Sequence, residues 1–173
     1  MSLTSWGLLP VEPGAPAAHE VWWSDRHAAL PDGPASLLAY GNGRSYGDVG
    51  LNSAGTLLHT RGIDRFIVFD ESTGRLVCEA GVLLSEILAV FVPRGFFLPV
   101  TPGTRYVTVG GAIANDVHSK NHHGAGTFGC HVQRFELLLR SDGSRRVCSR
   151  GEHAEWFAAT IGGLGLTGLI TWA

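Results

Sequence analysis

The sequence predicts an α+β fold, because pairs of short β-strands outnumber helices along the chain. Two pairs of apolar segments flank turns and are typical of β-hairpins: residues 66–70 with 76–80, and residues 132–140 with 145–149. Two segments, residues 83–91 and 155–161, place apolar residues at helical spacing. At 173 residues, of which 45% are hydrophobic and 16% charged, the chain is long enough for one globular domain with an apolar core, built as one unit or as two small lobes.

The other elements follow from local patterns. Short strands are predicted at residues 20–23, 36–40, 56–60 and 167–173, and a turn at residues 31–34. The helix predicted at 83–91 ends before Pro93, and Gly162 with Gly163 ends the helix at 155–161. Because the last strand carries no stop signal and no solvated tail, we expect this chain to be part of a longer polypeptide.

Composition excludes several classes of partner. The net charge of −2 offers no electrostatic basis for binding nucleic acid or an anionic membrane. Cys78, Cys130 and Cys148 are odd in number and contain no Cys-x-x-Cys pair, which disfavours a disulfide scaffold or a structural zinc site and fits a reducing cytoplasm. The first residues do not resemble a signal peptide, and no apolar run approaches the about 18 residues of a transmembrane segment.

The most informative stretch is residues 99–128, around the pair Gly110-Gly111. Adjacent glycines let a backbone approach a ligand closely, because no Cβ intervenes. A short helix starting there is expected to direct unpaired N–H groups outward, toward a phosphate or another anion. On this hypothesis a side chain at Gly110 would clash with the ligand and leave the apolar core able to fold.

Two further glycine-rich stretches occur. The first loop in chain order, residues 41–48, follows the predicted strand at 36–40, and a third cluster occupies residues 162–165. We expect the three glycine-rich loops to follow strands and to contact one long, phosphate-bearing ligand. The first loop is similar to the dinucleotide fingerprint, with Asp64 about 20 residues on, but its third glycine, Gly47, comes one place late. Residues 48–55 are also unsuited to the helix that a Rossmann unit requires, so that fold is disfavoured.

Three other interpretations stay open at this point. Glycine is common in the turns of any β-rich domain, so the loops alone do not prove a ligand. His118, His122 and His123 could present two imidazoles to a metal within one helical turn, although no His-Glu-x-x-His spacing accompanies them. A Ser-His-Asp hydrolase is less favoured, because the sequence has no Gly-x-Ser-x-Gly motif.

Taken together, four motifs resemble the FAD-linked oxidases of the vanillyl-alcohol-oxidase superfamily, which carry a PCMH-type FAD-binding domain. They are residues 40–48, 102–104, 107–114 and 116–123. The resemblance implies a two-lobed FAD domain, with one lobe at about residues 1–100 and the other at about residues 101–173. It also implies that the substrate domain of the family lies outside this chain.

The resemblance further implies which residues bind FAD. The first loop would wrap the pyrophosphate, the central stretch would follow the diphosphate and ribityl chain and reach the isoalloxazine, and one residue of the last strand would lie near the adenine. These residues are Tyr40, Gly41, Asn42, Gly43, Arg44, Ser45, Tyr46, Gly47, Asp48, Gly103, Thr104, Thr108, Val109, Gly110, Gly111, Asn115, Asp116, Val117, His118 and Ile170. His118 and Lys120 are expected to face the substrate as catalytic residues.

The implied activity is oxidation of a CH–OH group on a sugar or sugar-like small molecule by hydride transfer to flavin N5. Arg44 stands where covalently flavinylated members have a histidine, so we expect FAD to be bound non-covalently. This portion alone is expected to turn over little substrate. An aldonolactone or alditol oxidase of the same superfamily, and a non-catalytic dinucleotide-binding module, are the alternatives.

Overall fold

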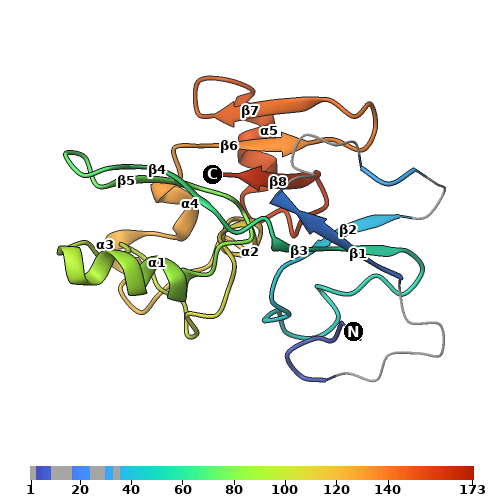
Figure 1. Cartoon of the computed structure of the whole chain (residues 1–173), viewed down its shortest axis with the longest axis horizontal. Coiled ribbons are helices and arrows are strands. Elements are labelled where there is room, and N and C mark those ends of the chain that lie inside the picture. Colours follow the sequence, from blue (N-terminus) through green and yellow to red (C-terminus); the bar gives the residue numbers. More distant parts are fainter. Residues whose placement is uncertain (1–2, 9–16, 24–29, 33–35) are drawn as a thin grey trace.

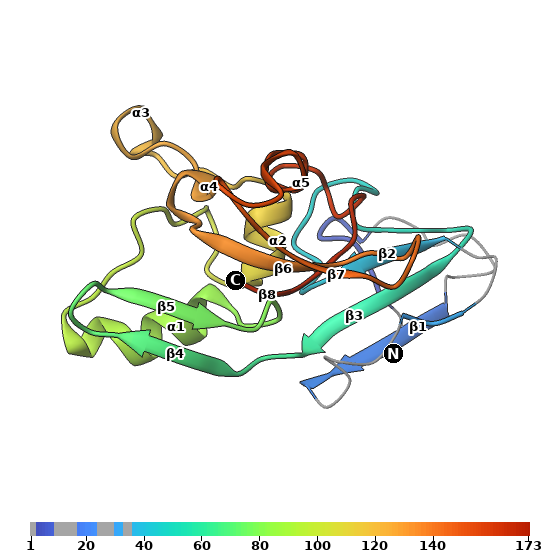
Figure 2. The same cartoon turned by 90° about the horizontal axis from the view of Figure 1, so that it is seen from above.

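The structure, a computed structural model, describes residues 3–8, 17–23, 30–32 and 36–173. Within this part of the chain, the strands form three small sheets, and helices pack around them (Figures 1 and 2). The mixture of parallel and antiparallel strands with short helices confirms the α+β class. The division into two lobes near residue 100 stays a prediction.

The first sheet is parallel and has the order β1-β3-β2. It consists of β1 (Ala17–Trp22), β2 (Leu37–Tyr40) and β3 (Thr56–Gly62), all predicted from their apolar residues. The central strand β3 is the most buried, with Leu57 and Leu58 almost fully covered. In β2, Leu38 and Tyr40 point inward, so this strand ends on a buried tyrosine directly before the first glycine-rich loop. The turn predicted at residues 31–34 lies partly outside the described residues.

The second sheet is the hairpin of β4 (Phe66–Asp70) and β5 (Arg75–Cys78), as predicted. Helix α1 (Leu84–Phe91) continues into a 3₁₀ turn, η2 (Val92–Arg94), which contains the proline expected to end the helix. Phe91 of α1 packs against Phe66 and Phe69 of β4, so the helix covers the hairpin (Figure 2).

The third sheet is antiparallel and has the order β7-β6-β8. Its strands are β6 (Arg134–Leu138), β7 (Arg145–Ser149) and β8 (Leu169–Trp172), and helix α5 (Ala154–Thr160) packs on it. The stacked rings of Phe135 and Phe157, with centroids 5.2 Å apart, join sheet and helix. The predicted hairpin, helix and terminal strand are therefore confirmed; β6 and β8 are shorter than expected, and α5 begins and ends one residue earlier than expected.

Residues 79–82 connect these parts. At their start, Cys78 and Ala173 exchange two backbone hydrogen bonds, and the N–H of Ala80 donates to the carbonyl of Thr171. Glu79 is fully buried, and its carboxylate accepts hydrogen bonds from the backbone and guanidinium of Arg65. The segment therefore fixes the hairpin to β8 of the third sheet.

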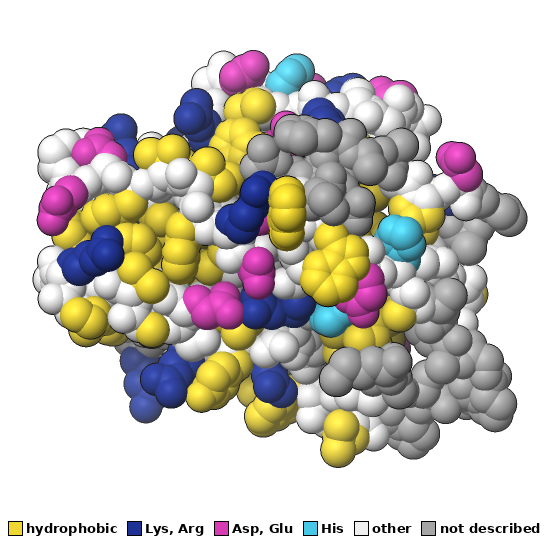
Figure 3. Space-filling model, in the orientation of Figure 1, with side chains coloured by type: hydrophobic (Ala, Val, Ile, Leu, Met, Phe, Trp, Pro, Cys, Tyr) yellow, Lys and Arg dark blue, Asp and Glu magenta, His cyan; other side chains and the backbone are white. Residues whose placement is uncertain are grey.

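Apolar side chains also reach the surface over the β4–β5 hairpin and α1, at the left of Figure 3. Phe66, Ile67 and Val68 of β4 are all exposed in this region. None of these three residues contributes to the cavity described below. Among the described residues, no helix has both the length and the apolar character needed to cross a membrane.

Candidate functional site: a cavity between three bends

The first loop, residues 41–48, has backbone donors without protein acceptors. The N–H groups of residues 42–46 donate to no acceptor among the residues that the structure describes. Gly43 and Gly47 both have φ of +60°, a conformation that other residues adopt at a cost. At Gly43 a Cβ would also lie within 2.7 Å of the Thr4 carbonyl oxygen, so this position tolerates no side chain. Successive N–H groups in such a turn form a concave site for an anion.

Side chains hold this loop in place. Asn42 donates from its amide to the Tyr106 carbonyl at 2.7 Å, and Tyr40 donates its hydroxyl to the Thr4 carbonyl at 2.6 Å. Burial raises the pKa of the Tyr40 hydroxyl, which therefore stays neutral and remains a donor at physiological pH. The Nε of Arg44 is buried and has no hydrogen-bond partner among the described residues. A buried donor without an acceptor is costly, so an acceptor that is not part of the described protein is expected beside Arg44.

Helix α2 (Val109–Ala114) forms another wall of the cavity, and it starts where the Gly110-Gly111 pair predicts a helix. The expectation of unpaired N–H groups at its start is wrong. Val109 and Gly110 donate to the carbonyls of Val82 and Ala80, both at 2.8 Å, and Gly111 donates to the Thr108 hydroxyl at 3.0 Å. The first turn of α2 is therefore docked on residues 79–82 and has no free amide to offer an anion.

Gly110 consequently serves packing. A Cβ at this position would lie 3.1 Å from the Cβ and 3.2 Å from the carbonyl oxygen of Ala80. The expectation that a larger residue here leaves the core undisturbed is therefore corrected, because the new side chain presses on the buried 79–82 segment.

The third bend, residues 162–168, is tied to the C-terminal end of α2. Gly162 donates to the Ile113 carbonyl, and Leu164 donates to the Ala114 carbonyl at 2.8 Å. Leu164 has φ of +56°, a strained value for leucine, and these bonds hold it there. The bend follows α5, and the central glycines lie at the start of α2, so of the three loops only the first follows a strand as expected.

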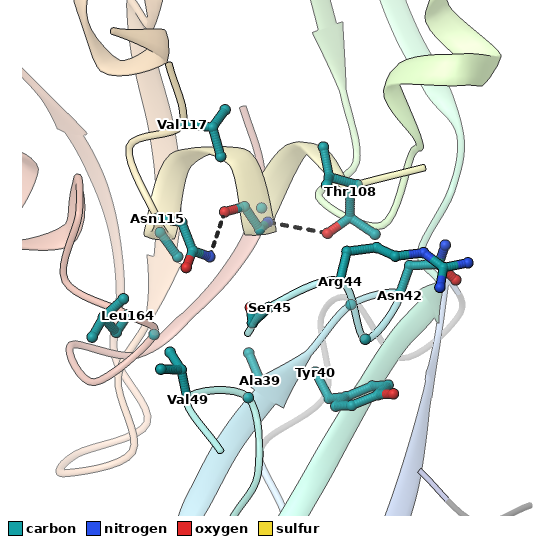
Figure 4. Close-up of a pocket in the computed structure, with 18 of the residues that line it drawn as sticks. Ala39, Tyr40, Asn42, Arg44, Ser45, Val49, Thr108, Asn115, Val117 and Leu164 are labelled. Carbon is teal, nitrogen blue, oxygen red and sulfur yellow. Dashed lines mark hydrogen bonds between the residues drawn. The ribbon is translucent and has the colours of Figure 1, made fainter. Parts of the chain in front are cut away.

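These three bends, which are the first loop, the start of α2 and residues 162–168, enclose one cavity. Its volume of about 580 Å³ is within the usual range of small-molecule sites. In the view of Figure 4, Asn42, Arg44 and Thr108 lie toward one end of it, and Val49 and Leu164 lie toward the other. Asn115, whose amide donates to the Gly111 carbonyl at 2.9 Å, extends from the end of α2. The bends are therefore neighbours in space, which the hypothesis of one shared ligand requires.

Most of the predicted site residues line this cavity: Tyr40, Gly41, Asn42, Gly43, Arg44, Ser45, Tyr46, Gly103, Thr104, Thr108, Gly110, Gly111, Asn115, Val117, His118 and Ile170. Five do not. Val109 is buried in the core, Asp116 accepts the N–H of Gly129 at 2.8 Å, and Gly47, Asp48 and Lys120 are not part of the lining.

Sequence reasoning missed other lining residues, including Ser5, Trp6, Val49, Thr60, Ala80 and Leu164. Ser5 and Trp6 carry no local signal, because they reach the cavity through long-range contacts. Leu164 lies inside the third glycine cluster, so the cluster itself was the available signal.

The histidines occupy two separate elements. His118 lines the cavity and forms a backbone bridge with Thr127, whereas His122 and His123 begin the short helix α3 (His122–Ala125). The three rings are neighbours, with centroids 5.3 Å apart for His118 and His122 and 4.0 Å apart for His122 and His123. Among the described residues, no three His, Cys, Asp or Glu side chains are grouped so that they could hold a metal ion. The arrangement of two imidazoles on one helical turn that includes His118 is therefore not observed.

Comparison with known proteins points to one cofactor. The sequence model of the family described as "FAD binding domain" matches residues 30–149, more than half of the chain. Decaprenylphosphoryl-beta-D-ribose oxidase of Mycolicibacterium smegmatis is 43% identical over 142 residues, which is 82% of this chain and 31% of that protein. L-gulonolactone oxidase of Mus musculus is 29% identical over 132 residues, 75% of this chain and 29% of the relative. Cytokinin dehydrogenase 8 of Oryza sativa is 29% identical over 155 residues, which cover 83% of this chain and 29% of that protein. The chain spans about a third of the length of these relatives.

Proposed function

This chain belongs to the FAD-binding domain family, and from that premise we propose that it is the FAD-binding part of an oxidoreductase acting on a CH–OH group of a sugar or sugar-like molecule. The observation that carries the proposal is the convergence of three glycine-rich bends on one cavity with unpaired amide donors. When bound, FAD supplies the hydride acceptor, flavin N5, for oxidation of the alcohol carbon.

The chemistry of the cavity fits a dinucleotide with a diphosphate. The unpaired N–H groups of residues 42–46 and the buried Nε of Arg44 are donors for an anion. Because the first amides of α2 donate to protein acceptors, we assign the diphosphate to residues 42–46 and Arg44. Gly103, Thr104, Thr108 and Gly111 would then follow the ribityl chain without supplying helix-end amides.

The two ends of the cofactor are assigned from the family resemblance and from the lining of the cavity. Asn115, Val117 and His118 would lie along the isoalloxazine, and Ile170 would lie near the adenine. For His118 the support is its place in the cavity lining. Lys120 is exposed and outside the lining, so its substrate role depends on a ligand that extends past the cavity. A base would take the hydroxyl proton of the alcohol, and His118 is our candidate.

Attachment and compartment are part of the proposal. We propose non-covalent FAD, because the resemblance implies a histidine at the position of Arg44 in members that link the flavin covalently. We also propose a cytoplasmic protein, in keeping with three free cysteines. A substrate domain elsewhere in the same polypeptide would complete the active site, since this chain spans 31% of the ribose oxidase.

Two relatives suggest the class of substrate. Two of the relatives are oxidases of decaprenylphosphoryl-beta-D-ribose and of L-gulonolactone. A ribose-type alcohol is our first candidate, because the first relative has the higher identity. An aldonolactone substrate is the second candidate, and it is supported by the second relative.

The test of cofactor and linkage is an absorption spectrum of the purified protein before and after acid precipitation. We expect flavin bands that move entirely into the supernatant. Flavin left in the pellet would contradict non-covalent attachment. A protein that is colourless and also fails to bind added FAD in a fluorescence titration would contradict the proposed function.

A further inference from the structure

The N-terminal segment, residues 3–8, lies against the first loop. The N–H of Trp6 donates to the Ser45 carbonyl at 3.3 Å, and the carbonyl of Thr4 accepts the Tyr40 hydroxyl. Leu3 packs against the small apolar cluster that includes Leu38. The segment lies outside residues 30–149, the part of the chain that the family model matches, although Ser5 and Trp6 line the cavity.

Within this segment, Trp6 makes the contact that matters most for the cavity. The guanidinium carbon of Arg44 lies 4.9 Å from the centre of the Trp6 ring. Arg44 has no hydrogen bond or ion pair with any residue that the structure describes, and the Trp6 ring is the aromatic face that its guanidinium contacts. An arginine above a tryptophan face is attracted by the ring quadrupole, and its hydrogen-bonding edge remains available.

We propose that Trp6 is a positioning residue for the cofactor: its ring holds the Arg44 guanidinium beside the first loop, ready for a diphosphate. The inference rests on the proposed function, since it assumes that FAD occupies the cavity. Without the ring, Arg44 is free to sample other rotamers, and binding must then order the side chain. Residues 3–8 therefore contribute to FAD affinity through Arg44, although they precede the matched domain.

The chain offers a matched control for this proposal. Trp23 lies under Arg65 with the guanidinium carbon 4.6 Å from its ring centre, and it is 52% exposed, compared with 53% for Trp6. The second pair has the same contact between a tryptophan ring and a guanidinium and a tryptophan of equal exposure, although Arg65 is also paired with Glu79, and neither Trp23 nor Arg65 lines the cavity. A general effect of removing an exposed tryptophan–arginine pair should therefore appear equally at both sites.

The experiment is a double-mutant cycle on FAD affinity, measured by flavin fluorescence titration of the apoprotein. We expect Trp6→Leu to raise the Kd about 3- to 10-fold, while Trp23→Leu leaves it unchanged. Trp6→Tyr retains an aromatic face and should keep the Kd within about twofold. In an Arg44→Met background, Trp6→Leu should cause no further loss, because the group that it positions is gone.

Three outcomes would overturn the inference: a normal Kd for Trp6→Leu, an equal loss for Trp23→Leu, or the same factor lost in the Arg44→Met background. The last result would mean that Trp6 touches the cofactor directly or supports the fold. If the unaltered protein bound no FAD at all, the proposed function would fail and this inference with it. The two failures are therefore distinguishable.

Discussion

Replacing Arg44 with methionine tests the first loop as the anion-binding part of the cavity. The change removes the charge and the unpaired Nε and keeps a flexible side chain of similar length. A hydrogen bond to a charged group contributes about 1.5–3 kcal/mol, which corresponds to a Kd for FAD that rises about 10- to 150-fold. A full Coulomb interaction at about 4 Å would be worth about 4 kcal/mol at an effective dielectric constant of about 20, and this value bounds the effect from above.

The assay is the FAD titration at two salt concentrations. The loss caused by Arg44→Met should shrink at high salt, because ions screen the attraction in the unaltered protein. The Kd for FAD of Arg44→Lys should lie between those of the unaltered protein and Arg44→Met, since lysine keeps the charge but lacks the planar guanidinium. Arg94→Met is the control, because Arg94 lies over the Phe91 ring, is exposed and does not line the cavity. An unchanged Kd for Arg44→Met would remove Arg44 from the site and refute the assignment of the diphosphate to this loop.

Three further predictions concern the glycines, the hairpin turn and the thiols. Gly110→Val should lower the melting temperature of the FAD-free protein by several degrees, since overpacking costs about 1–3 kcal/mol. Gly103→Val should leave the melting temperature unchanged and weaken FAD binding, because a Cβ at Gly103 meets no protein atom within 4 Å. Equal melting temperatures for the two variants would contradict the packing role of Gly110. Hydrogen bonds from the turn lower the pKa of Asp70 to about 2, so its stabilisation is present above its unfolded pKa of about 3.9 and is lost as the pH falls toward 2. Asp70→Asn should therefore lower the urea midpoint at pH 6, by an amount that narrows between pH 4 and pH 2, and a constant difference would refute this reasoning. The Cys130 thiol is exposed and has a lowered pKa, whereas burial raises the pKa of the Cys78 and Cys148 thiols. Alkylation of the native protein at pH 7.5 should therefore modify Cys130 alone, as measured by peptide mass spectrometry. Rapid modification of a second thiol would contradict the burial of Cys78 and Cys148.

Local signals made much of the fold predictable. The turn at Asp70 and the apolar spacing before Pro93 are encoded within a few residues, so the first hairpin and α1 could be predicted almost to their ends. The parallel pairing in the first sheet could not be predicted. Leu37 and Ala17 both pair with Thr56 across long separations, and nothing in those strands specifies the partner or the register.

Most of the cavity could also be predicted from local motifs, and the prediction failed where the lining depends on contacts between residues distant in sequence. The motifs at residues 40–48 and 102–118 are each an unbroken stretch of sequence, and most residues of each stretch line the cavity. Trp6 could not be found, because its place depends on backbone contacts with Ser45, which is distant in sequence. The family resemblance implies that His118 and Lys120 both face the substrate, but only His118 lines the cavity, and Lys120 is exposed outside the lining.

The first loop and the start of α2, both rich in glycine, also show why composition alone cannot locate an anion site. A Cβ would clash at Gly43 and would press on Ala80 at Gly110, yet the amides around the two glycines have different partners. Around Gly110 the amides donate to residues 80 and 82, so the missing side chain permits a helix to dock on a buried segment. Around Gly43 the missing side chain makes room for the Tyr40 hydroxyl and the Thr4 carbonyl, and the loop amides have no acceptor among the described residues. An amide that already donates to protein cannot also bind phosphate well, so the partners of the amides, and not the number of glycines, support our proposal that the diphosphate binds the loop after β2.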